Sequence, residues 1–308
     1  MAGTPTIPEH FDEMIRSNFE LAIQKTDFDF SNACKMEYNV PGDGSRVDIS
    51  HEATYVEESS RFQPYETHEA STSMRKYTLR PGHVLQSFSK HDKIDLGRLA
   101  LPTSQAMKSI VAARNRRKNS IFIEGLDADA RTGADGSLIV QFPSENIIAK
   151  NYIYGGTGSA SGLTGAKMLQ AMRMFDDNNV PKDRRFLACN PYAYQSILSD
   201  ADGRDLIINS DYNGGKVFTN GGIATGMYIH GFQLIVTTAI NDTLYNDGDD
   251  DLYKCFAFHA DYAAFGENRS PLVIERLQSD GSIRILEDSS FGMVREQDKA
   301  FVKILIKA

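Results

Sequence analysis

The chain of 308 residues is long enough for one large domain or two modest ones, and a chain of this size buries about three quarters of its surface on folding. Its composition, 41% hydrophobic and 24% charged, is ordinary for a globular protein and excludes wholesale disorder. The formal net charge of -8 opposes undirected adhesion to nucleic acid or to an anionic membrane. Any contact with DNA is therefore expected to be local.

The three cysteines, Cys34, Cys189 and Cys255, are odd in number and include no CxxC pair. This pattern argues against zinc binding and disulfide exchange, and it favours folding in a reducing cytoplasm. The N-terminus lacks the basic and apolar regions of a signal peptide, and no apolar run is long enough to cross a membrane. We therefore expect a chain that is neither secreted by a standard signal nor membrane-spanning.

The first part of the chain combines one helix with a long extended stretch. Thr6 to Glu9 match a capping box, which predicts a short amphipathic helix running to about Ala22. From about Thr26 to Leu79, Gly, Ser, Thr and acidic residues dominate, and apolar residues are sparse. This stretch cannot build a core of its own, so we expect it to become ordered by lying on another surface, such as a neighbouring subunit.

Three helices are predicted further along. Thr103 or Ser104 follows Pro102 as an N-cap, and apolar residues then recur at helical spacing to Leu126, which predicts a long helix. A second helix is predicted from about Thr164 to Asp176. Its apolar face is expected to carry Leu169, Met172 and Phe175. A third is predicted to begin at Asn190 and Pro191, an N-cap with proline in the first turn.

Short β-branched or aromatic runs, bounded by Gly, Asn or Asp, predict strands between and after these helices. The runs are Phe186–Cys189, Phe232–Thr237, Phe256–His259, Ile283–Leu286 and Phe301–Ile306. The fold class is therefore α+β.

Charge is segregated along the chain. Residues 1–61 hold 12 acids and 5 bases, net -7, whereas residues 75–118 hold 11 bases and 2 acids, net +9. These blocks are either two solvated faces or contact surfaces through which the basic segment of one subunit docks on acidic segments of its neighbours. The candidate inter-subunit residues are Arg75, Lys76, Arg80, Lys90, Lys93, Arg98, Glu57 and Glu58.

A glycine-rich stretch from Gly155 to Lys167 precedes the second helix. Its spacing fails the Walker A loop, the dinucleotide fingerprint and the nucleophile elbow. We interpret it as a flexible hinge between lobes, with an anion site as the weaker alternative. The hinge glycines are Gly155, Gly156, Gly158 and Gly162.

Catalytic and metal-binding patterns are weak. His51 and Glu52 begin like a zinc-protease helix, but position 55 is Tyr. The acidic run Asp247–Asp251 lacks the spacing of a calcium loop. Tyr77 and Phe88 lie within the basic block, which is only a weak signal for nucleic-acid binding. We expect no catalytic residue, metal or cofactor.

Taken in order, these segments resemble the major capsid proteins of tailed bacteriophages, which have the Hong Kong 97-like fold. The resemblance rests on an extended N-terminal arm, on the run Ser73–Gly82, and on the long helix. It also rests on Leu163–Tyr192, on Gly226–Val236 with its Gly-Phe turn, and on the terminal Phe291–Val302.

The resemblance implies five segments. Residues 1–66 would form the N-terminal arm and first peripheral strand, and 67–95 the extended hairpin called the E-loop. Residues 96–155 would form the peripheral domain with its spine helix, and 156–270 the axial domain. Residues 271–308 would return to the peripheral domain as C-terminal strands.

The resemblance also implies a structural function. The chain would assemble in the host cytoplasm into pentamers and hexamers of an icosahedral virion capsid, contacting packaged double-stranded DNA non-specifically. It implies three partners: a separate scaffolding protein, a portal protein and decoration proteins. The scaffolding protein is expected to be separate because the chain has no room for the scaffold segment that some relatives carry. Covalent crosslinking is not predicted.

Three alternatives remain open from sequence. The chain could be an encapsulin, a cellular nanocompartment shell protein of the same fold. It could be a soluble enzyme that uses the glycine-rich stretch to bind a phosphate ligand. It could also be another structural component of a phage, such as a tail or decoration protein.

Overall fold

The fold is described from a computed structural model of the chain. The residues described are 27–40, 46–50, 55, 57, 72–88, 103–133, 136–199, 218–219, 222–223, 228–240, 252–269, 273–276 and 283–307. The expected N-terminal helix and the acidic run Asp247–Asp251 lie outside them.

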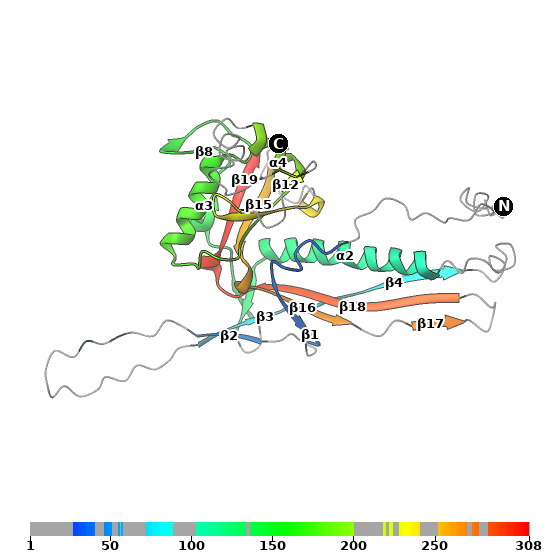
Figure 1. Cartoon of the computed structure of the whole chain (residues 1–308). Helices are drawn as coiled ribbons and strands as arrows, with labels where there is room; N and C mark the ends of the chain where they lie inside the picture. Colours follow the sequence, from blue (N-terminus) through cyan, green and yellow to red (C-terminus); the bar gives the residue numbers. More distant parts are fainter. Residues whose placement is uncertain are drawn as a thin grey trace, which may run out of the picture.

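A six-stranded sheet organises the compact part of the molecule (Figure 1). Its strand order is β13 (Tyr228–Ile229), β14 (Phe232–Val236), β10 (Arg185–Cys189), β15 (Leu252–His259), β19 (Phe301–Lys307) and β7 (Ile147–Ile148). Two helices, α3 (Gly165–Asp177) and α4 (Pro191–Ser199), pack their buried side chains into the same core. All five side chains of β10 are buried, as expected for a central strand.

A five-stranded sheet extends away from this compact part as a long limb, with α2 (Thr103–Asp127) lying along it (Figure 1). Its order is β1 (Lys35–Tyr38), β16 (Ala263–Arg269), β18 (Ile283–Arg295) and β17 (Val273–Arg276), and β4 (Arg80–Phe88) also pairs with β18. The strand β18 is therefore the central strand of the limb, because it pairs with β16, β17 and β4.

Smaller sheets complete the described fold. A four-stranded sheet has the order β2 (Arg46–Ser50), β3 (Thr72–Lys76), β5 (Ala130–Thr132) and β6 (Leu138–Val140). Two short hairpins pair β8 (Tyr152–Ile153) with β9 (Gly156–Thr157) and β11 (Phe218–Thr219) with β12 (Gly222–Ile223). Short 3-10 turns cover Ser144–Asn146, Thr238–Ile240, Ala260–Tyr262 and Asp298–Ala300.

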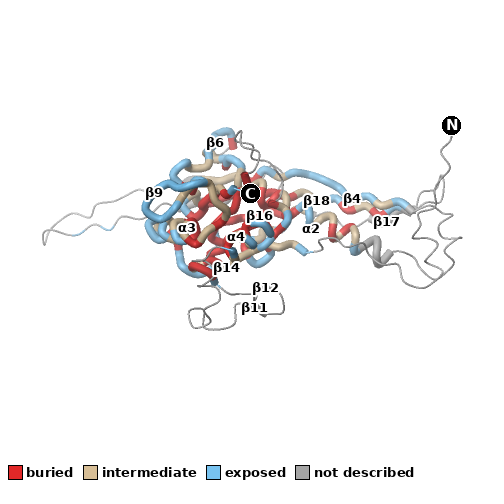
Figure 2. Tube along the Cα trace, turned by 90° about the horizontal axis from the view of Figure 1, so that it is seen from above, coloured by how far each residue is buried: buried red, intermediate tan, exposed pale blue. Residues whose placement is uncertain are grey.

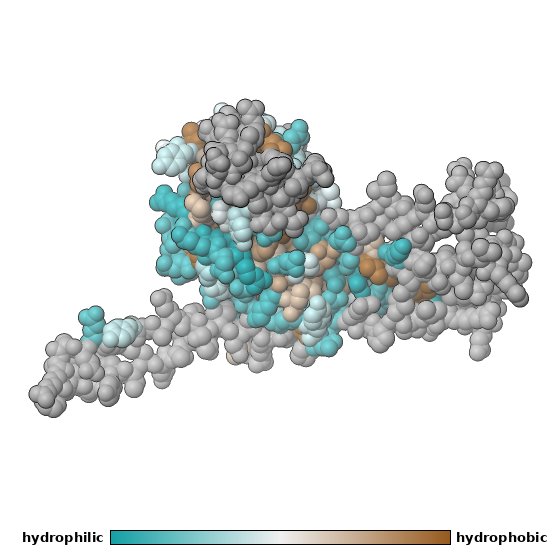
Figure 3. All heavy atoms as spheres, in the orientation of Figure 1, coloured by the Kyte–Doolittle hydropathy of each residue, from teal (hydrophilic) through white to brown (hydrophobic). Residues whose placement is uncertain are grey.

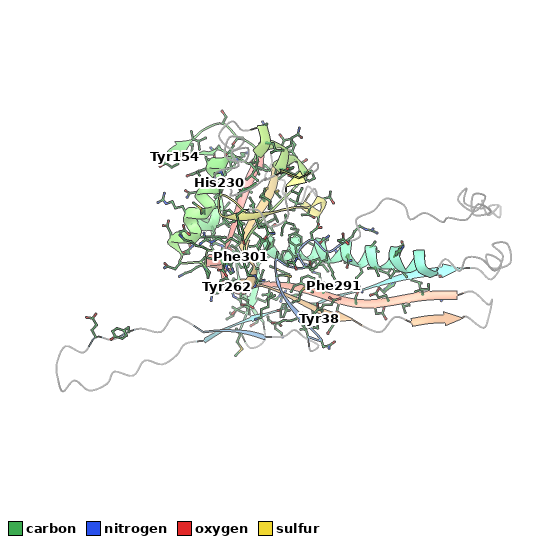
Figure 4. All side chains as sticks on the ribbon, viewed as in Figure 1. Tyr38, Tyr154, His230, Tyr262, Phe291 and Phe301 are labelled. Atoms are coloured by element: carbon green, nitrogen blue, oxygen red, sulfur yellow. The ribbon has the colours of Figure 1, made fainter. Side chains whose placement is uncertain are left out.

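One continuous core joins the compact part to the limb. The ring of Phe122, on α2, stacks on Phe30 with centroids 4.3 Å apart. It also lies 5.6 Å from Phe258 on β15 and 6.1 Å from Phe265 on β16. Buried residues are concentrated where these elements meet, with Phe291 and Phe301 nearby (Figures 2 and 4). The two large sheets are therefore held together by aromatic packing around one helix.

Most predicted elements are confirmed. The long helix, the second helix and the third helix appear as α2, α3 and α4, and all five predicted strand runs lie in β10, β14, β15, β18 and β19. The amide of Ala193 donates to Oδ1 of Asn190 at 2.7 Å, which confirms the N-cap of α4. Leu169 was assigned wrongly to the buried face of α3, because that face is formed by Met168, Ala171 and Phe175 while Leu169 is 40% exposed.

The described part of residues 26–79 becomes ordered by lying on other elements, as expected, but these elements belong to the same chain rather than to a neighbouring subunit. Phe30, Ala33 and Cys34 are buried in the main core of the same chain, and Val40 and Tyr77 are buried in a second small cluster. Apolar residues are too few here to form an independent core. The rings of Phe28 and Phe30 nevertheless pack against Phe122 on α2 and so hold this segment on the core.

The hairpin expected between residues 67 and 95 is formed differently. β3 pairs with β2 in antiparallel register, whereas β4 pairs with β18 in another sheet. The run around Pro81 and Gly82 resembles a hairpin turn in sequence, but Pro81 lies opposite Ser290 near the start of β4. Because β4 has one paired neighbour, this edge position tolerates a proline. The hairpin of this region is β2–β3, with residues 51–71 between the strands.

The expected boundaries at residue 270 also differ from the strand pairing. β16, placed by sequence in the axial segment, pairs with β1 and β18 in the five-stranded sheet. β19, expected to return to the peripheral domain, pairs with β15 in the six-stranded sheet. The last part of the chain therefore crosses between the two sheets, which local sequence patterns do not encode.

None of the described helices is long and apolar enough to span a membrane.

Candidate assembly surface

Two ion pairs attach the basic middle of α2 to the sheet beneath it. Lys118 Nζ lies 2.6 Å from Glu267 Oε2, and both side chains are more than nine-tenths buried. Arg114 Nη1 lies 2.6 Å from Glu287 Oε1, and the Glu287 side chain is 1% exposed. Buried charges of this kind require partners, because desolvation of an unpaired ion is costly. These two cations of the basic block are therefore used within the chain.

The C-terminal end of α2 is attached to the six-stranded sheet through Asp127. Its carboxylate accepts from Lys254 on β15 and forms an ion pair with Lys303 on β19. Burial acts to raise the pKa of Asp127, but hydrogen bonds from the two lysines outweigh it and lower the pKa below its usual value. Asp127 therefore stays ionised and joins the helix to two strands.

Two of the predicted inter-subunit cations have partners in their own chain. Arg75 Nη2 lies 2.8 Å from Asp298 Oδ2, and both side chains are largely buried. Arg80, which is half exposed, pairs with Glu124 on α2. The charge of Arg75 therefore attaches β3 to the turn before β19 within one chain, and contact of Arg75 and Arg80 with neighbouring subunits stays a prediction.

The remaining candidates are more open. Lys76 is partly buried and has no ion-pair partner among the described residues. Glu57 is exposed. Lys90, Lys93, Arg98 and Glu58 lie outside the described residues. Exposed side chains over the visible face of the compact part are mainly hydrophilic (Figure 3).

A pocket of about 200 Å³ lies between the C-terminal turns of α2, the end of β18 and the strands β3 and β5. Its charged lining consists of Lys76, Arg80, Arg131, Arg295 and Asp129. The sequence pattern did not point to Arg131 and Arg295, because both lie outside the basic block at residues 75–118. Only the pairing of β3 with β5 and the packing of β18 under α2 bring them together.

The glycine-rich stretch does not join two lobes. It follows β7, which pairs with β19, and it precedes α3, which contacts both of these strands. Both flanks therefore belong to the same packed unit. Gly155, with φ of 83°, forms the turn of the β8–β9 hairpin together with Tyr154, and Gly156 pairs with Ile153 as the first residue of β9. Gly162 is closely packed, since a Cβ there would lie 2.2 Å from Oγ of Ser196. The expectation of a flexible hinge between lobes is therefore wrong: the stretch is a packed connection within the six-stranded unit.

A buried lysine holds this connection. Lys167 Nζ donates to the carbonyl oxygens of Lys150, Ser161 and Gly162 at 2.8, 2.8 and 2.9 Å, and to that of Leu305 at 3.3 Å. Burial lowers the pKa of Lys167 to about 8. The ammonium group is turned into the protein and bound by carbonyl oxygens, so Lys167 is not placed to bind a phosphate ligand.

No cluster of three His, Cys, Asp or Glu side chains that could hold a metal ion occurs among the described residues. Burial raises the pKa of both Cys34 and Cys189 to about 12, so neither is a thiolate nucleophile near neutral pH.

A long helix on an extended sheet, joined to a compact six-stranded unit, defines a capsid-type α+β fold. The sequence matches the phage capsid protein family over residues 7–308, and the chain belongs to that family. It is therefore a structural protein, a major capsid protein of a phage head rather than an enzyme. The match also favours a phage capsid over the encapsulin alternative.

Solved structures similar to this chain include phage capsids. The capsid of Ralstonia phage GP4 has a TM-score of 0.67 at 12% identity, covering 100% of this chain and 97% of that chain. The capsid of cyanophage Pam1 has a TM-score of 0.68 at 10% identity, covering 95% of each chain. The capsid of cyanophage P-SCSP1u has a TM-score of 0.65 at 11% identity, covering 94% and 91%. No curated protein matches the sequence.

Proposed function

We propose that the chain forms the pentamers and hexamers of an icosahedral phage head that encloses double-stranded DNA. The observation that carries this proposal is the shape of the subunit. The α2 limb extends from one side of the compact part and the β2–β3 hairpin points to the other side (Figure 1). A subunit with two limbs offers separate surfaces to several neighbours, as heterologous contacts that close into rings require.

Within this proposal, each described unit has a part. The six-stranded unit with α3 and α4 is the axial domain, and α2 with the five-stranded sheet is the peripheral domain. The β2–β3 hairpin takes the place of the E-loop. The aromatic core around Phe122 keeps the first two in a constant relative orientation, which a closed shell of identical subunits needs.

The partners proposed are those of a head assembled in the host cytoplasm. A separate scaffolding protein would guide closure, a portal protein would occupy one vertex, and decoration proteins would bind the finished surface. DNA would be contacted non-specifically, and the net charge of -8 would limit how broadly the shell adheres to phosphates.

Assembly of the purified chain tests the proposal. The chain is expressed with and without a candidate scaffolding protein, sized by light scattering on a column, and imaged in negative stain. Closed shells, or rings with five and six subunits, are expected. A compact monomer of 34.2 kDa under every condition would contradict the proposal.

A further inference from the structure

The chain passes between the two large sheets at two neighbouring turns. It leaves the six-stranded sheet at His259, the last residue of β15, and enters the five-stranded sheet as β16. It returns through the turn between β18 and β19. The amide of Glu296 on the second turn donates to the carbonyl oxygen of Tyr262 on the first at 2.9 Å, where the compact part meets the limb (Figure 4). The relative position of the two sheets therefore depends on these turns as well as on the aromatic core.

The ring of His259 holds the first of these turns. Its Nδ1 accepts a hydrogen bond from the amide of Asp261 at 3.2 Å and so caps the short 3-10 turn Ala260–Tyr262. A backbone amide can only donate, so Nδ1 must carry a lone pair and the ring must be neutral, with its proton on Nε2. A protonated ring has hydrogen on both nitrogens and cannot accept this bond. The bond that caps the turn therefore exists in only one protonation state of His259.

Three charged side chains act on this buried ring. Asp183 and Arg184 belong to the loop before β10, and Asp261 belongs to the turn itself. Oδ1 of Asp183 lies 3.9 Å from Nε2, which is beyond hydrogen-bond reach, and the Asp183 side chain is 75% exposed. Arg184 and Asp261 form an ion pair with each other. Asp183 is therefore the carboxylate that a protonated ring would attract.

Other charged groups on the packed elements have partners of their own. Arg185 lies opposite the ring in the register of β10 and β15, but its Nη2 lies 2.7 Å from Oδ1 of Asp176. Glu296, on the second turn, pairs with Lys35 at 3.3 Å. Neither group needs the ring of His259 to be charged.

Burial keeps the ring neutral near pH 7. The His259 side chain is 1% exposed, and burial lowers its pKa below the usual 6.5, an effect that Asp261 and Asp183 offset only in part. The folded chain therefore takes up a proton here only at acidic pH. That proton comes from solvent and binds Nδ1, in place of the hydrogen bond from Asp261.

We propose that His259 is a proton-sensitive switch in the connection between the two sheets. The neutral ring holds the turn by accepting from Asp261, and the protonated ring releases the turn and moves toward Asp183. Acid therefore loosens the connection between the six-stranded unit and the limb. The proposal concerns a single subunit and does not depend on the proposed function.

Amide exchange in the purified, unassembled chain tests the switch. The peptide that covers residues 256–264 is followed at pH 7.5 and at pH 5, after correction for the intrinsic pH dependence of exchange. We expect its exchange to be about fivefold faster at pH 5, because the loss of one hydrogen bond changes an opening equilibrium by about this factor. The internal reference is α4, which contains no charged residue and should keep its protection.

Three variants separate the ring from its surroundings. His259→Asn keeps an acceptor for the Asp261 amide but takes up no proton, so the turn should stay protected at both pH values. His259→Leu removes the acceptor, and exchange should be fast at both. Asp183→Asn keeps the ring but removes the nearest carboxylate, so the pH at which exchange accelerates should move lower.

Two results would overturn the proposal. The first is equal exchange of this peptide at both pH values in the native chain. The second is an acid-dependent rise in His259→Asn that matches the native one, which would assign the response to another group, such as Glu296. If His259→Leu does not fold, the native chain and the two Asn variants still decide between these outcomes.

Discussion

Lys118 and Glu267 form a buried ion pair, with 2.6 Å between Nζ and Oε2, that ties the middle of α2 to β16. The ammonium group also lies 5.8 Å from the ring centroid of Phe28 and 5.4 Å from that of Phe291. The pair therefore lies among aromatic rings, where an unpaired charge would be poorly solvated. The ion pair therefore connects α2 to the sheet through Glu267, and Lys118 also contacts the segment at residues 27–40 through Phe28.

Removing one partner of this pair is expected to be severe. Lys118→Ala leaves the Glu267 carboxylate buried without its counter-ion, which should lower the free energy of unfolding by about 3–5 kcal/mol. Urea unfolding measures the change. The control is the double variant Lys118→Met with Glu267→Leu, which removes both charges and should recover most of the loss. A double variant as unstable as the single one would contradict this explanation.

Lys167 should make stability depend on pH in the alkaline range. Burial lowers its pKa from 10.5 to about 8, so between these values the unfolded chain binds more protons than the folded one. The stability of the native chain relative to Lys167→Met should therefore rise with pH through this window and be level below it. Urea unfolding from pH 7 to 10 measures the difference.

Lys299→Met is the matched control, because Lys299 is exposed. Its difference from the native chain should show no such rise. The same slope in both variants would mean that Lys167 does not titrate as its burial requires. At neutral pH, Lys167→Met should still be destabilising, because the backbone carbonyls around Nζ lose their donor.

Gly125 lies where α2 packs closely against Met293 on β18. A Cβ at this position would lie 2.6 Å from Cβ of Met293, a contact that the backbone must move to relieve. Gly125→Ala should therefore cost about 1–3 kcal/mol, as overpacking of a core does. Gly82→Ala is the control, since nothing lies within 4 Å of a Cβ there. Thermal unfolding of both variants measures the difference, and the midpoint of Gly125→Ala should be the lower one. Equal unfolding midpoints would contradict this explanation.

Phe122→Ala should weaken the junction between the two large sheets. The loss of ring contacts to Phe30, Phe258 and Phe265 is expected to cost about 3–5 kcal/mol. Hydrogen exchange should then show β15 and β18 losing protection at different denaturant concentrations, whereas they unfold together in the native chain. Equal protection of both strands in the variant would show that other contacts hold the junction.

Periodicity and capping predicted the elements well. The long helix, the N-cap at Asn190 and the strand runs are local patterns, and each is present near its predicted place, although β18 continues to Arg295, well beyond the predicted run Ile283–Leu286. The Hong Kong 97-like resemblance depended on the order of these elements, and membership of the phage capsid protein family agrees with it.

Long-range pairing was beyond the sequence. The charge block at residues 75–118 is visible in the sequence, but its partners Glu267, Glu287 and Asp298 lie 149, 173 and 223 positions further along the chain than the cations they pair with, and only the fold brings them together. The glycines at 155–162 appeared flexible because nothing in a sequence reveals that Lys167 and Ser196 pack against them. The return of β19 to the six-stranded sheet likewise depends on pairing rather than on propensity.

The central claim, that this chain builds a closed head, is tested most directly by electron cryomicroscopy of particles formed from the purified protein. The account predicts shells with five- and six-subunit rings, in which the six-stranded units meet at the ring axes and α2 limbs lie between neighbouring subunits. Particles without these rings, or a chain that stays monomeric with every candidate scaffolding protein, would contradict it.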